Sequence, residues 1–142
     1  MKWLIVTLGL VAGMTSASAQ GLIGLEKQVL PLTTRNWIAF RNYDGRQWIY
    51  FTHLVVYRCG LSEIRYSIGS DDLDQTFPLP PCDEQRPNAI DPVAYPPYLT
   101  MPIDTATSIA VRVVYADGEE SQTVRLAPCN APGDSACAVL LE

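Results

Sequence analysis

The chain contains a single histidine, His53, so any reaction that needs an imidazole base must use this residue. His53 lies in an apolar alternating run between Phe51 and Val55, and its phase predicts that it faces the core in a packing role. The sequence has no Gly-x-Ser-x-Gly, Ser-x-x-Lys or His-Glu-x-x-His motif and no glycine-rich phosphate loop. We therefore expect no catalytic site and no cofactor.

Acidic side chains gather in and after the segment 69–74, where carboxylate oxygens offer ligands to a hard cation such as Ca²⁺. Their spacing does not match an EF-hand, and a solvated turn accounts for them without a metal. We predict no metal site, with Ca²⁺ binding left as an alternative. A small periplasmic hydrolase that uses acidic side chains is a further alternative. The residues in question are Asp71, Asp72, Asp74, Asp83 and Glu84.

The strongest candidate for molecular recognition is a group of aromatic and arginine side chains in the segment 37–50. Trp, Tyr and Arg are the residue types that carry most of the binding energy at protein interfaces. If this segment is a hairpin, Arg41 lies over Trp48 on the side away from the core, which favours a cation–π contact. The predicted binding face consists of Trp37, Arg41, Tyr43, Arg46, Trp48 and Tyr50.

A two-residue turn at Asp44-Gly45 positions this face. Asp-Gly between alternating runs is a strong hairpin signal because both turn residues must accept positive φ. The resulting register sets Phe40 opposite Ile49 on the core side and Arg41 opposite Trp48 on the other side. The second strand is predicted to continue through 52–59.

A second turn, at Gly60-Leu61, is predicted to return the chain into a third strand. It sets Tyr57 opposite Ile64 and Val55 opposite Tyr66, which keeps one continuous apolar side across the meander. A short first strand is expected near 28–30.

The segment 77–102 contains eight prolines, which cannot donate hydrogen bonds to a sheet. It is predicted to be a long, ordered, proline-rich loop that is tethered by a disulfide. Tyr95 and Tyr98 in this loop provide the structural alternative to a binding face, in which the loop lies over the aromatic rings and hides them.

A second Asp-Gly hairpin spans 108–126, with Ile109 opposite Leu126, Val111 opposite Val124 and Val113 opposite Gln122. Short strands between Gly, Pro and Asp turns, without a 3.6-residue period, predict an all-β, two-sheet antiparallel sandwich. The hairpin around Asp117-Gly118 resembles the closing hairpin of fibronectin type III and immunoglobulin-like domains. The resemblance implies that type of architecture and carries over no functional residue.

The four cysteines, an even number in a chain with an export signal, predict two disulfides. They have no Cys-x-x-Cys spacing, so zinc ligation is not favoured. Of the three possible connectivities we favour Cys59 with Cys82 and Cys129 with Cys137, because sequence neighbours close short loops.

The N-terminus predicts a cleaved signal peptide. Lys2 precedes an apolar run, 4–14, and Ala17-Ser18-Ala19 fits the small-x-small pattern of a cleavage site after Ala19. Residues 20–142 then form one domain in the periplasm or outside the cell. Loss of Lys2 changes the formal charge of the chain from −5 to −6, since nine cations remain against 15 acids. Such an acidic chain is not expected to bind nucleic acid or to insert into membranes.

Together these features predict an exported, non-enzymatic binding or accessory module that contacts a protein or glycan partner, an inhibitor-like role included. A structural component of the envelope without a discrete ligand site is the alternative. The oligomeric state is left open.

Overall fold

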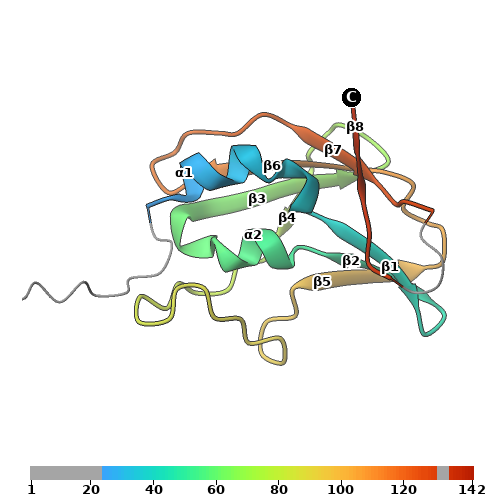
Figure 1. Cartoon of the computed structure of the whole chain (residues 1–142), viewed down its shortest axis with the longest axis horizontal. Helices are drawn as coiled ribbons and strands as arrows, with labels where there is room; N and C mark the ends of the chain where they lie inside the picture. The colour runs from blue at the N-terminus through green and yellow to red at the C-terminus, as the bar shows by residue number, and fades with distance from the viewer. Residues whose placement is uncertain (1–23, 131–134) are drawn as a thin grey trace, which may run out of the picture.

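Two antiparallel sheets form the framework of the protein (Figure 1). The computed structural model describes residues 24–130 and 135–142, so the predicted signal peptide, 1–19, lies outside the described residues. The smaller sheet has the order β1-β2-β5, made of β1 (Ala39–Tyr43), β2 (Arg46–Tyr50) and β5 (Tyr98–Pro102). The larger has the order β4-β3-β6-β7-β8, made of β4 (Gln75–Phe77), β3 (Leu61–Ile68), β6 (Ile109–Tyr115), β7 (Val124–Ala127) and β8 (Val139–Leu141).

The first predicted hairpin is confirmed. Asp44 and Gly45 form its turn with φ angles of 50° and 69°, the left-handed values that the Asp-Gly signal requires. Phe40 pairs with Ile49 and Arg41 pairs with Trp48, as the turn predicts. The apolar pair Phe40 and Ile49 is buried, so the opposite side of the hairpin faces outward.

The second hairpin is confirmed only near its open end. Ile109 pairs with Leu126 and Val111 with Val124, but the predicted pairing of Val113 with Gln122 is wrong. Val113 instead exchanges hydrogen bonds with Ser121, whose backbone N–H donates to the Val113 carbonyl and whose Oγ accepts from the Val113 N–H. A side-chain acceptor thus replaces a ladder carbonyl, and the register shifts by one residue.

The segment predicted to continue the second strand is helical, so the strand through 52–59 and the Gly60-Leu61 turn are both wrong. It forms α2 (Thr52–Val56) and the 3₁₀ helix η3 (Arg58–Gly60), and Leu61 begins β3 instead. Phe51, Leu54 and Val55 are buried together at helical spacing. The apolar run 54–57 fits both periods, and the need to cross from one sheet to the other selects the helix.

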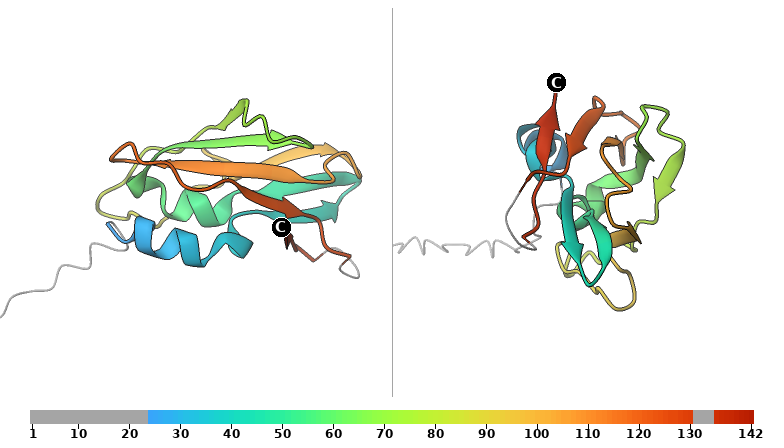
Figure 2. Two further views of the ribbon diagram at one scale, coloured as in Figure 1. Left: turned by 90° about the horizontal axis from the view of Figure 1, so that it is seen from above. Right: turned by 90° about the vertical axis from the view of Figure 1, so that its right-hand side faces the viewer.

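The predicted strand near 28–30 is also wrong, because the chain there is helical. It forms α1 (Glu26–Val29) and two 3₁₀ helices, η1 (Leu30–Leu32) and η2 (Thr34–Asn36). Pro31 at the start of η1 lacks an N–H that a helix start would leave unpaired in any case. Helices α1 and α2 lie toward one end of the molecule, and the tip of the β1–β2 hairpin lies at the other (Figures 1 and 2).

The chain between β4 and β5, residues 78–97, contains turns and no helix or strand. The end of the segment predicted as loop is a strand, because β5 pairs with β2 through Trp48 with Thr100 and Tyr50 with Tyr98. Proline interrupts β5 only at its last residue, Pro102, so the rest of the strand keeps its N–H donors.

A single core lies between the two sheets and the helices. Phe51, which follows β2, stacks on Phe77 of β4 at 4.1 Å between ring centroids. The C-terminal segment joins the sheets, because Phe40 of β1 forms a β-bridge with Cys137, just before β8. Both predicted disulfides, Cys59–Cys82 and Cys129–Cys137, are confirmed. Within residues 24–130 and 135–142, no helix has the length and apolar character needed to cross a bilayer.

Candidate functional site

The outer side of the three-stranded sheet carries an aromatic cluster. The rings of Trp48 and Tyr50 are 6.5 Å apart and close to parallel, at 15°. Tyr98 of β5 lies 4.7 Å from Trp48 and 6.0 Å from Tyr50 and is inclined to both rings. Two rings therefore form a floor and the third forms a wall beside it. We call the set Arg41, Tyr43, Trp48, Tyr50 and Tyr98 the aromatic face.

The orientation of Trp48 is fixed by a hydrogen bond within the hairpin. Its Nε1–H donates to the carbonyl oxygen of Tyr43 at 2.9 Å. The polar atom of the indole is thus already bonded within the chain. Arg41 does not cover Trp48 as predicted, because its guanidinium lies 4.1 Å from the centroid of the Tyr43 ring. Trp48 is only half-buried.

Trp37 does not belong to this face, contrary to the prediction. It is 1% exposed, and its Nε1–H donates to the carbonyl of Leu30 at 3.0 Å. Strand alternation would place residue 37 outward, but Trp37 has helical angles, with φ −61° and ψ −36°, at the end of η2. The backbone therefore turns before β1 begins and directs the indole into the core. Tyr43 and Arg46 lie exposed as a pair at the tip of the hairpin.

The alternative that the proline-rich segment covers the rings holds in part. Tyr98 packs against Trp48 and Tyr50 and leaves all three rings half-buried. Tyr95 makes no ring contact with the face and is 44% exposed elsewhere. The rings are therefore supported from one side and accessible from another.

A shallow hollow of about 830 Å³ adjoins the aromatic face and shares Arg41 and Tyr50 with it. Among the described residues that line it, the polar groups are an amide, hydroxyls, an imidazole and one guanidinium, and none of these residues is acidic. The hollow is lined by Asn36, Ala39, Arg41, Tyr50, Thr52, His53, Val56, Ser135 and Ala136.

His53 lies in this hollow on α2 and not on the predicted inward strand position. Its Nε2 is 2.9 Å from Oγ1 of Thr33, and that hydroxyl itself donates to the carbonyl of Val29 at 3.0 Å. Because the hydroxyl proton is used, Nε2 must be the donor and Nδ1 carries the lone pair of the neutral ring. Burial lowers the pKa of His53, which favours this neutral form. No described residue hydrogen-bonds to Nδ1, so it can accept a bond from a ligand.

The acidic residues considered as metal ligands do not converge. Asp71 forms a two-point ion pair with Arg125 at 2.8 and 2.9 Å, and Asp83 pairs with Arg86 at 3.2 Å. Asp72 and Asp74 are exposed. In the described part of the chain, no three His, Cys, Asp or Glu residues are grouped so that they could hold a metal ion.

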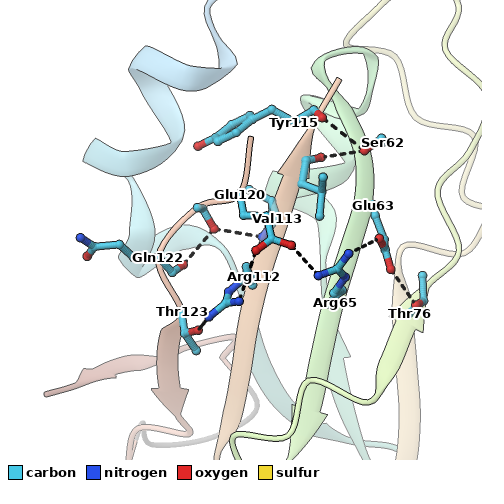
Figure 3. Close-up of polar contacts among 12 residues, drawn as sticks. Ser62, Glu63, Arg65, Thr76, Arg112, Val113, Tyr115, Glu120, Gln122 and Thr123 are labelled. Carbon is cyan, nitrogen blue, oxygen red and sulfur yellow. Dashed lines mark hydrogen bonds and ion pairs between the residues drawn. The ribbon is translucent and has the colours of Figure 1, made fainter. Parts of the chain in front are cut away.

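The outer side of the five-stranded sheet carries a charge network instead of aromatic rings (Figure 3). Arg65 and Arg112 are direct cross-strand neighbours, and Glu120 bonds both, at 2.6 and 3.4 Å. Arg65 also bonds Glu63 at 3.0 Å, while Arg112 donates to Thr123 at 2.8 Å. We define these five residues as the charge network. It went unrecognised in the sequence because Glu120 reaches β3 and β6 only through the shifted register of the second hairpin.

Comparison with family models, curated proteins and solved structures finds no match to this chain.

Proposed function

We propose that the protein is an exported, non-enzymatic binding module that contacts a glycan or protein partner through the aromatic face. One observation carries the proposal: Trp48, Tyr50 and Tyr98 form a pre-oriented floor and wall that remain accessible on the outside of a sheet. Pre-organised rings lose little conformational entropy on binding. Their polar atoms need not be desolvated where, as in Trp48, they are already bonded within the chain.

The chemistry of the surface supports a glycan more than a flat protein surface. The π face of an aromatic ring carries partial negative charge, which attracts the C–H groups on the apolar side of a sugar ring. The adjoining hollow offers Nδ1 of His53 as an acceptor for ligand hydroxyl groups. Stacking floor and polar hollow together match a ligand with one apolar side and many hydroxyls.

An exported β-sandwich of the immunoglobulin or fibronectin III type is the architecture that we propose for this module. Such scaffolds hold recognition side chains on sheets and loops over a rigid core. An inhibitor-like or accessory role fits the same face, since both need contact without turnover. A saturable partner distinguishes this proposal from an envelope component without a discrete ligand site.

Binding of the processed, oxidised protein to a glycan array and to immobilised envelope extract tests the proposal. We expect saturable binding to one class of ligand, lost in Trp48→Ala and largely kept in Trp48→Phe, which retains a ring face. Thermal unfolding of both variants separates loss of the surface from loss of the fold. Equal binding by the wild type and Trp48→Ala, or no binding by a folded wild type, contradicts the proposed role of the aromatic face.

A further inference from the structure

A buried arginine forms the floor of a second pocket, away from the aromatic face. Arg58 lies in η3, next to the Cys59–Cys82 disulfide, and is only 7% exposed. A buried guanidinium is costly unless its donors and its charge are both compensated. The hydrogen-bond partners of Arg58 therefore show whether its donors and its charge are compensated within the chain.

Arg58 is held by backbone carbonyls and not by a carboxylate. Its Nε–H donates to Pro81 at 2.9 Å, and Nη1 donates to Pro87 at 3.1 Å and to Val55 at 3.3 Å. A guanidinium has five N–H donors, and these bonds use the one on Nε and the two on Nη1. Among the described residues nothing accepts from the two hydrogens of Nη2.

The open side of Arg58 faces a pocket of about 530 Å³ between η3 and the loop 78–97. Proline rings, Ile90 and Tyr95 supply its apolar walls. Its two acidic side chains are engaged by the loop itself: Asp83 pairs with Arg86, and Asp91 accepts the backbone N–H groups of Val93 and Ala94. The lining residues are Arg58, Pro80, Pro81, Cys82, Asp83, Arg86, Ala89, Ile90, Asp91, Pro92 and Tyr95.

We propose that this pocket binds a ligand carboxylate through Nη2 of Arg58. A carboxylate oxygen supplies both the missing acceptor and the missing negative charge, and charge-assisted bonds of this kind are stronger than neutral ones. Asp83 is already paired with Arg86, but Asp91 in the lining disfavours a doubly charged anion such as phosphate, so a single negative charge fits best. Only one nitrogen is available, so the contact uses Nη2 alone and not the two-nitrogen fork.

The carboxylate has two possible sources, the C-terminus of a peptide and a small organic acid. The apolar walls favour a peptide end, because they would contact the side chains that precede the carboxylate. This site is distinct from the aromatic face, since its pocket and the hollow beside that face have no described lining residue in common.

Nuclear magnetic resonance of the processed, oxidised protein tests the proposal through the Nε–H signal of Arg58, assigned by its loss in Arg58→Lys. The probes are acetyl-Ala-Pro-Leu as the free acid, the same peptide as its C-terminal amide, and acetate. We expect a saturable shift with the free acid and binding at least about tenfold weaker with the amide, the cost of a lost charge-assisted bond. Acetate that binds as well as the peptide identifies small acids as the ligand.

If Arg58→Lys fails to fold, two other variants still test the proposal. Tyr95→Ala removes a partly exposed wall, so peptide binding should weaken while acetate binding is unchanged. Arg35→Lys, at an exposed arginine on η2, should change neither. Equal affinity for acid and amide, or an Arg58 signal that does not move with any probe, overturns the proposal. Trp48→Ala should leave peptide binding intact, so failure here does not bear on the aromatic face.

Discussion

The outer sides of the two sheets carry different kinds of side chain. On the five-stranded sheet the outward positions carry charges that bond one another, so Arg65 and Arg112 share Glu120. On the three-stranded sheet the outward positions carry aromatic rings, and the polar atom of one of them, Nε1 of Trp48, is bonded to the Tyr43 carbonyl within the chain. The first surface pairs its charges, although Nε of Arg112 has no hydrogen-bond partner in the part of the chain that the structure describes, whereas the second keeps ring faces available for a partner.

This difference indicates which of the two sheet surfaces is available to bind a ligand. Exposed ion pairs contribute little to stability and are screened by salt, but together they leave few donors and acceptors for a ligand. Half-buried aromatic rings are held in place by the fold but keep part of their surface exposed. A partner can bury that remaining surface, as happens to aromatic residues at binding interfaces. The comparison therefore predicts that substitutions on the two sides affect different properties.

The largest effect separates Trp37, which precedes β1, from Trp48 in β2. Trp37→Ala should destabilise the fold by about 3–5 kcal/mol, because a nearly fully buried indole is removed along with its bond to Leu30. Trp48→Ala should cost clearly less, since that ring is half-buried. Chemical denaturation of both variants gives the comparison. Similar losses of unfolding free energy in the two variants would show that Trp48 is part of the core and is not available for binding.

Removal of the Cys59–Cys82 disulfide should come next. Loop-closure entropy for a separation of 23 residues predicts a loss of about 3 kcal/mol in the Cys59→Ser/Cys82→Ser double variant. The loop that it tethers leads to Pro97, whose carbonyl accepts the N–H of Phe51, and then to Tyr98. Near-ultraviolet circular dichroism from the aromatic face should therefore weaken. The matched double variant at Cys129 and Cys137 should lose stability but keep that signal. The same loss of signal in both double variants would show that the loop 78–97 does not specifically order the rings.

Local turn chemistry explains which parts of the fold were predictable. Both Asp-Gly hairpins and the two disulfides follow from short sequence separations, and the structure confirms them except for the register at Val113. The helix α2 was not predictable from periodicity, because a run that is apolar at every position fits strand and helix alike. Its helical form depends on the crossing between sheets, which is a tertiary requirement.

The sequence predicts the part of the candidate site that lies within one hairpin. Arg41, Trp48 and Tyr50 follow from one hairpin register, whereas Tyr98 joins them through the pairing of β5 with β2 across the loop. Trp37 was misplaced because the strand begins two residues later than alternation suggests. The tautomer of His53 depends on Thr33, which is 20 residues away, between η1 and η2. Contacts of this kind have no sequence pattern.

A smaller effect is expected from Glu120→Gln in the charge network. The substitution keeps the size of the side chain but removes the charge between Arg65 and Arg112, two like charges directly opposite each other. We expect Tm to fall by a few degrees at low salt and by less at high salt, where repulsion is screened. Differential scanning calorimetry at two ionic strengths measures this. Glu84→Gln, at an exposed residue, is the control and should change little.

The smallest effect is the pH dependence that Glu63 of the charge network contributes. The bond from Arg65 lowers the pKa of Glu63 below its ordinary value. A carboxyl with a lowered folded-state pKa stabilises the fold above the unfolded pKa, about 4.3, and that contribution is lost as pH falls through the folded value. Tm should therefore decline less steeply in Glu63→Gln than in the wild type below about pH 4.3. The Trp48→Ala variant should keep the wild-type slope, and a slope altered equally in both variants would show that the two surfaces are coupled.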